Sequence, residues 1–92
     1  MSPPVVARRV VVTGHVQGVF FRECARGEAD RRGVAGWVRN CADGTVQAHF
    51  EGPPEAVAEL LRWCRCGPRH ATVDDVHVSD IEPEGLEGFR IR

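Results

Sequence analysis

The 92-residue sequence contains no lysine and no tyrosine. Because all 12 basic residues are arginines, lysine Schiff-base chemistry is excluded, and the cationic groups of an anion site here would be guanidinium groups rather than a titratable lysine amine. The 13 acidic residues bring the net charge to -1, which leaves no broad positive field for a polyanion. Nucleic acid is therefore not an expected partner.

The sequence also lacks long apolar runs and a signal peptide. No run approaches the roughly 20 apolar residues of a membrane-spanning helix, and residues 1–7 lack the charged start of a signal peptide. We therefore expect a cytoplasmic protein without a membrane partner. The cysteines are too sparse for a disulfide scaffold, so we expect free thiols at Cys24, Cys41, Cys64 and Cys66.

Length and composition indicate one globular domain. Apolar residues make up 42% and charged residues 27%, and a chain of this size can bury a core without metals or disulfides. Pro3 and Pro4 predict a flexible N-terminal tail over residues 1–7, which leaves residues 8–92 for the domain. The size and the initiating Met favour a free-standing monomer.

The first half of the chain predicts a strand followed by a helix. Residues 8–13 are rich in valine and end at Gly14, as a strand would. Residues 21–32 carry apolar or small side chains at helical spacing, and Gly33 closes that helix. The residues expected on its buried face are Phe21, Cys24, Ala25 and Ala29.

The second half predicts a hairpin, a helix and one or two final strands. Residues 36–39 and 45–50 flank an Asp-Gly turn, and an amphipathic helix follows Gly52 with its stripe at Val57, Leu60, Leu61 and Cys64. Residues 76–78 and 89–91 alternate as strands do. The order predicts an α+β, ferredoxin-like β-α-β-β-α-β fold, with two helices on one face of an antiparallel sheet.

The connection between the first strand and the first helix, residues 14–20, is the candidate anion site. Glycines at 14 and 18 permit positive φ, so that successive N–H groups can converge on an anion beside a helix N-terminus. Arg22 follows in the first helical turn and could bind phosphate oxygens bidentately. By spacing alone, an ordinary turn explains the two glycines better than a phosphate site does, and Arg22 could equally be a solvated arginine.

Other candidate residues have simpler explanations than catalysis. Cys64, Cys66 and His70 do not have the spacing of a zinc site. Cys64 and Cys24 fit the core, and Trp37 and Phe20 are expected to be packing residues. His49 is expected to be an outward strand residue, and neither it nor His15 is assigned a role.

Two motifs resemble those of the acylphosphatase family. The first is similar to a G-x-V-Q-G-V-x-F-R core and runs from Val12 to Arg22. The second begins with the run Gly36-Trp37-Val38-Arg39-Asn40 and continues with Gly44, Val46 and Gly52. The resemblance extends more loosely over about residues 8 to 92.

The resemblance implies a small acylphosphatase, which hydrolyses acyl phosphates to a carboxylate and inorganic phosphate. It implies catalytic roles for Arg22, which binds phosphate, and Asn40, which positions the attacking water. It implies no metal and no cofactor. Glycines 14 and 18 would only allow the loop to adopt its shape. The implied phosphate cradle consists of the backbone amides of His15, Val16, Gln17, Gly18, Val19 and Phe20.

The residue types suit this reaction. The leaving carboxylate of an acyl phosphate has an intrinsic pKa of roughly 4, so it can depart without a general acid. Two other functions stay open on the residues alone. One is a non-catalytic phosphate-binding or regulatory module on the same scaffold, and the other is RNA binding, which the lack of paired aromatic residues and of basic excess disfavours.

Overall fold

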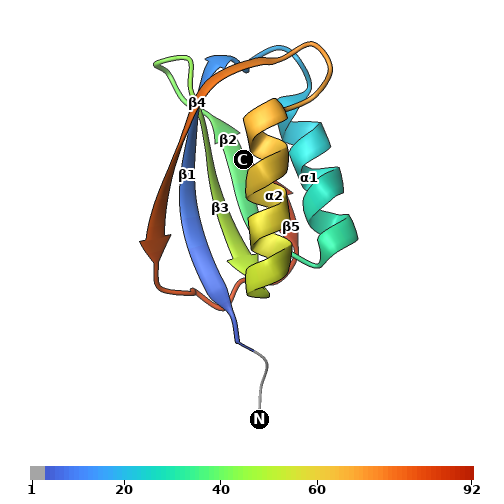
Figure 1. Ribbon diagram of the computed structural model, residues 1–92, viewed down its shortest axis with the longest axis vertical. Coiled ribbons are helices and arrows are strands. Elements are labelled where there is room, and N and C mark those ends of the chain that lie inside the picture. The colour runs from blue at the N-terminus through green and yellow to red at the C-terminus, as the bar shows by residue number, and fades with distance from the viewer. Residues whose placement is uncertain (1–3) are drawn as a thin grey trace.

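The computed structural model describes residues 4–92 and shows five strands and two helices (Figure 1). No helix within this range is long and apolar enough to cross a membrane. In chain order the elements are β1 (Val6–His15), α1 (Phe21–Arg32), β2 (Ala35–Asn40), β3 (Val46–Gly52), α2 (Pro54–Cys66), β4 (Thr72–Ile81) and β5 (Phe89–Ile91).

The strands form one sheet in the order β4-β1-β3-β2-β5. Neighbours pair antiparallel except at the last position, where β5 runs parallel to β2. The ferredoxin-like order is confirmed, and the antiparallel sheet predicted from the sequence becomes a mixed one. The reason is that residues 82–88 carry the chain from β4, at one edge, to the free edge of β2 at the other.

Both helices cover the same face of the sheet (Figure 1). In α1 the buried residues are Phe21, Ala25 and Ala29, whereas Cys24 is only half-buried. In α2 they are Val57, Leu60 and Cys64. These side chains meet the alternating apolar residues of the strands, among them Val10, Val12, Val38, Val46, Ala48 and Phe50. Burial of this apolar surface is the main force that holds the layers together.

The first strand is longer than predicted at both ends. Val6 and Ala7 pair with Gly52 and Glu51 of β3, and Ala7 is 1% exposed, so these two residues belong to the sheet rather than to a tail. Pro4 and Val5 precede the strand, and residues 1–3 of the predicted tail lie outside the described range. At the other end, Gly14 and His15 still pair with β4.

The face of the sheet that lacks helices is nevertheless covered at its centre. His49 points away from the helices as predicted, but it is fully buried. Its ring stacks on that of Trp37 at 6.1 Å between centroids, and the guanidinium groups of Arg9, Arg39 and Arg92 lie 4.4 to 5.5 Å from the Trp37 ring. Trp37 is confirmed as a packing residue, at 6% exposed. Cation–π contacts thus close this face where helices do not.

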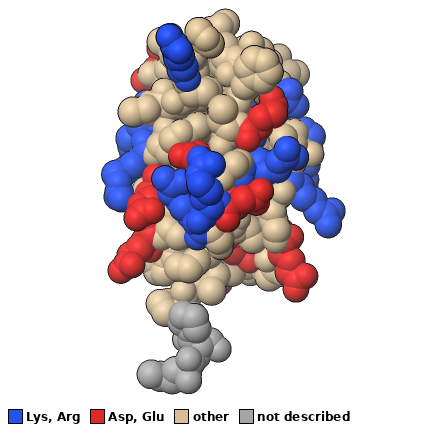
Figure 2. Space-filling view, turned by 90° about the vertical axis from the view of Figure 1, so that its right-hand side faces the viewer, with Lys and Arg blue, Asp and Glu red and all other residues tan. Residues whose placement is uncertain are grey.

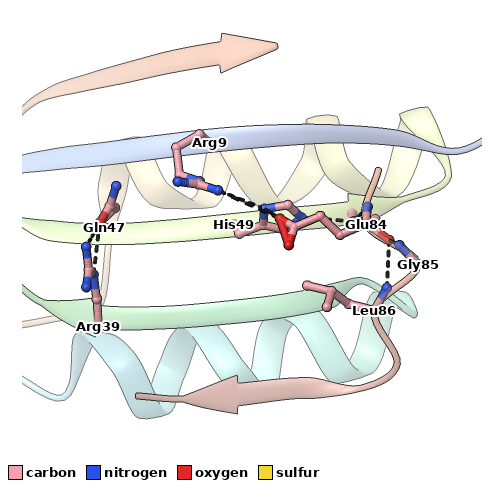
Figure 3. A network of polar contacts seen from close by, with 8 residues as sticks. Arg9, Arg39, Gln47, His49, Glu84, Gly85 and Leu86 are labelled. Atoms are coloured by element: carbon pink, nitrogen blue, oxygen red, sulfur yellow. Dashed lines mark hydrogen bonds and ion pairs between the residues drawn. The ribbon is translucent and has the colours of Figure 1, made fainter. Parts of the chain in front are cut away.

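A buried carboxylate holds the loop that leads to β5 (Figure 3). Glu51 is 4% exposed and accepts hydrogen bonds from the backbone amides of Glu84, Gly85 and Leu86 at 2.8 to 2.9 Å. The Nε2 of His49 lies 2.9 Å from the same carboxylate. Burial raises the pKa of Glu51, but these hydrogen bonds outweigh burial, and the net effect lowers the pKa below its ordinary value of 4.5.

The lowered pKa predicts how stability depends on pH. The ionised Glu51 stabilises the fold above about pH 4.5, and this contribution is lost as pH falls through the lower pKa of the folded state. Glu51→Gln should lower the free energy of unfolding by about 1–3 kcal/mol at pH 7 and weaken its dependence on pH in the acid range. Urea unfolding between pH 3 and pH 7 measures both effects.

The matched control is Glu87→Gln, which removes an exposed carboxylate from the same loop. It should leave the unfolding free energy within about 0.5 kcal/mol of the wild-type value. Equal unfolding curves for the two variants at every pH would contradict the role given to Glu51.

Candidate active site

The candidate site begins where β1 shifts register against β4, between Thr13 and Gly14. Gly14 has φ +124°, and a Cβ atom there would collide with the carbonyl oxygen of Thr72 and lie 2.8 Å from the backbone nitrogen of Asp74. Only glycine allows β4 to pass this close. The glycine therefore fixes the place where β1 changes register, one residue before the strand ends at His15 and the loop begins.

Two buried valines anchor that loop, whose backbone amides have no partners of their own. Val16 is 1% and Val19 is 7% exposed, and both belong to the hydrophobic core. Within the described range, the amides of residues 16–20 donate no hydrogen bond, and the first backbone bond of α1 runs from Cys24 N to Phe20 O. The amides of residues 21–23 are therefore also free, as expected at a helix N-terminus without a cap. Such a run of free N–H donors favours the binding of an anion.

Phe20 is exposed rather than packed, so the prediction of a packing role for it is wrong. It is 70% exposed, and at φ 65° it is the single non-glycine residue with positive φ in the part of the chain that the structure describes. The left-handed conformation turns its side chain outward, and Val19 fills the core position instead. For a bulky residue this conformation costs on the order of 1–2 kcal/mol.

Arg22 lies in the first turn of α1, directly after this strained residue. Its side chain is half-buried, and it takes part in none of the ion pairs found in residues 4–92. Other arginines do pair with acids, as Arg8 does with Asp80 at 3.1 Å. A half-buried, uncompensated guanidinium beside free amides makes this corner of the molecule attractive to an anion.

Asn40 is the last residue of β2, where it pairs with Val46 across the hairpin. The turn after it is held by Asp43, which accepts hydrogen bonds from the amide and hydroxyl of Thr45 at 3.1 and 2.7 Å. These bonds lower the pKa of Asp43. The Oδ1 of Asn40 is buried and has no hydrogen-bond partner in the described structure. Since a buried acceptor is costly when unpaired, this oxygen is placed to accept a hydrogen bond from a ligand or a water molecule.

The side chain of Gln17 joins the loop to this hairpin. Its Nε2 donates to the carbonyl oxygens of Cys41 at 2.7 Å and of Thr45 at 2.9 Å. Cys41 directly follows Asn40, so the two bonds fix the position of the hairpin relative to the loop. From the sequence, only the backbone amide of Gln17 was predicted to have a role. The fixed glutamine of the first motif was the one signal that could have revealed this side-chain role.

Arg22 and Asn40 line one cavity of about 200 Å³, together with Val16, Gly18, Phe20, Phe21 and Glu23. The structure thus brings the two proposed catalytic residues together although 18 positions separate them in sequence. Of the predicted cradle residues, Val16, Gly18 and Phe20 line the cavity. His15, Gln17 and Val19 do not line it, and His15 is exposed at the end of β1.

The cysteines lie apart from any metal-like arrangement. All four are free thiols, and Cys64 is fully buried, which raises the pKa of its thiol to about 12. Residues 4–92 contain no group of three or more His, Cys, Asp or Glu side chains that could hold a metal ion. The set of Cys64, Cys66 and His70 considered from the sequence is therefore not assembled.

The fold and the cavity define a class: small α+β proteins with a cavity between a strand-to-helix loop and a neighbouring hairpin. The acylphosphatase family model matches residues 8–91. The chain is 53% identical over its whole length to an acylphosphatase of Haloquadratum walsbyi, covering 99% of that protein. It is 60% identical over 83 residues to one from Nocardioides, which covers 90% of this chain and 84% of that protein.

A solved structure shares the architecture. The acylphosphatase from Coxiella burnetii superposes with a TM-score of 0.93 at 36% identity, over 96% of this chain and 93% of that one. The chain therefore belongs to the acylphosphatase family. Its activity is the hydrolysis of acyl phosphates, which excludes a purely non-catalytic module.

The position of Gln17 leads to a test. Gln17→Ala removes both hydrogen bonds, and we expect it to lower the free energy of unfolding by about 1–2 kcal/mol. Because Asn40 is then held less firmly against the loop, kcat for benzoyl phosphate should fall about tenfold or more. Steady-state kinetics and urea unfolding measure the two effects.

The chain offers a matched control in its second glutamine. Gln47 accepts hydrogen bonds from Arg39 on the sheet face without helices, away from the cavity (Figure 3). Gln47→Ala should retain wild-type kcat. If Gln17→Ala turns over benzoyl phosphate as fast as Gln47→Ala does, the side chain of Gln17 has no part in positioning the site.

Proposed function

We propose that the phosphoryl group of the substrate binds in the cavity between the loop and the hairpin, held by the backbone amides of residues 15–20 and by Arg22. The observation that carries this proposal is that Arg22, which has no ion-pair partner, lines one cavity with Val16, Gly18 and Phe20, whose backbone amides donate no hydrogen bond. Phosphoryl transfer needs mainly positioning and stabilisation of charge on the equatorial oxygens. Donors that are in place before the substrate arrives supply this without reorganisation.

Asn40 orients the attacking water. Its unpartnered Oδ1 accepts a hydrogen bond from that water, and the oxygen of the water then attacks phosphorus in line with the bond that breaks, its protons staying on the phosphate product. The bond between phosphorus and the bridging oxygen is cleaved, and the electron pair leaves with the carboxylate. The products are a carboxylate and inorganic phosphate.

No acid, metal or cofactor is required for this leaving group. The carboxylate has an intrinsic pKa of roughly 4 and departs as an anion at neutral pH. General-acid or metal assistance is needed for poor leaving groups such as alkoxides, and an acyl phosphate does not contain one. The reaction class and this set of residues therefore match each other.

We also propose that the protein is a cytoplasmic monomer that binds no nucleic acid, and the surface supports the last two of these properties. Basic and acidic side chains are interspersed on the face seen in Figure 2, so this face carries no extended basic patch. Three large apolar residues are exposed in the described range: Val5 before β1, Phe20 before α1 and Val78 in β4. Because they lie in separate segments, they do not form an apolar interface.

Two substitutions test the proposed roles separately. Arg22→Ala should lower kcat/KM for benzoyl phosphate by at least 100-fold and weaken competitive inhibition by inorganic phosphate, because it removes a charged donor to the phosphoryl group. Asn40→Ala should lower kcat by about 100-fold and leave phosphate inhibition unchanged, because it disturbs the water and not the cradle. Steady-state kinetics in excess chelator measure both.

Arg26→Ala serves as the control for lost positive charge, since Arg26 is an exposed residue of the same helix. It should keep wild-type kinetics. Full activity of Asn40→Ala, or loss of wild-type activity on chelation, would contradict the proposed mechanism.

A further inference from the structure

Phe20 combines two features that oppose stability. Its ring is 70% exposed, and its backbone adopts the left-handed conformation, which disfavours every side chain larger than that of glycine. A glycine would meet the backbone requirement without strain. An exposed aromatic side chain in a strained conformation at a cavity is therefore a sign of a functional role.

The position of Phe20 relative to the cavity indicates what that role is. The ring lines the same cavity as Arg22 and Asn40, yet most of its surface is open to solvent, so it stands at the mouth rather than inside. At about 200 Å³ the cavity is smaller than the roughly 300–1,000 Å³ of sites that enclose a whole drug-sized ligand. When the phosphoryl group occupies the cradle, the acyl group must extend through this mouth.

We propose that the Phe20 side chain is the acyl-group subsite of this enzyme and that it favours aryl and other apolar acyl phosphates over small acyl phosphates. This rests on the proposed binding of phosphate by the loop and Arg22. Val16 and Phe21 contribute apolar surface to the wall of the same cavity. An aromatic acyl group can stack on the exposed ring, whereas the single methyl group of acetyl phosphate covers little of it.

The test compares kcat/KM for benzoyl phosphate with kcat/KM for acetyl phosphate in each variant. Any change in the cradle acts on the phosphoryl group of both substrates and cancels in the ratio. Phe20→Ala and Phe20→Gly should lower the benzoyl-to-acetyl ratio about 2- to 10-fold, the range expected for loss of one aromatic pair. Phe20→Trp should retain the ratio. Phe20→Gly is included because glycine keeps the positive φ, so the loop stays intact.

Val78→Ala is the matched control, since Val78 is an exposed apolar residue of β4 that does not line the cavity. Its ratio should equal that of the wild type. An unchanged ratio in both Phe20→Ala and Phe20→Gly would overturn the subsite, whether the absolute rates fall or not. A fully active Asn40→Ala would instead contradict the proposed mechanism and leave the ratio test standing.

Discussion

Two hydrogen bonds from the carboxamide of Gln17 connect the loop after β1 to the hairpin that carries Asn40, and the proposed mechanism depends on this connection. The loop that follows β1 supplies the amides and leads to Arg22, while the hairpin between β2 and β3 carries Asn40. The sheet places these segments near each other because β1 and β2 both pair with β3. The two hydrogen bonds of Gln17 then hold the loop in place against the hairpin.

Several local costs of the structure occur at the same cavity. Free amides, a guanidinium without a counterion, an unpaired carboxamide oxygen and a strained phenylalanine all occur there. On the opposite face of the sheet, by contrast, Glu51 receives hydrogen bonds from three amides and from His49. The site is therefore less stable by itself than its surroundings, which is the usual condition of a preorganised active site.

Much of the fold follows from the sequence because its signals are local. The stripe of α2, the Asp-Gly turn and Gly33 after α1 each predict an element whose bounds the structure confirms within two residues. The parallel pairing of β5 depends on how Glu51 holds a loop more than 30 residues away, and no local pattern contains that information. The burial of His49 has the same cause, since the residues that cover it come from other elements.

The site was predictable to a similar extent. The motifs identified Arg22 and Asn40, and the structure places both on one cavity. The packing role predicted for Phe20 was wrong because its side chain is 70% exposed on a left-handed backbone, a conformation that a phenylalanine in a sequence does not predict. The side-chain role of Gln17 depends on a contact with a distant hairpin, so composition and spacing alone do not show it.

The central claim is that this protein holds a phosphoryl group and directs water at phosphorus. Hydrolysis of benzoyl phosphate in water enriched in oxygen-18 tests it directly, with mass spectrometry of both products. The account predicts that the heavy oxygen enters inorganic phosphate and that benzoate keeps its original oxygens. Heavy oxygen in benzoate would show attack at the carbonyl carbon and would contradict the account.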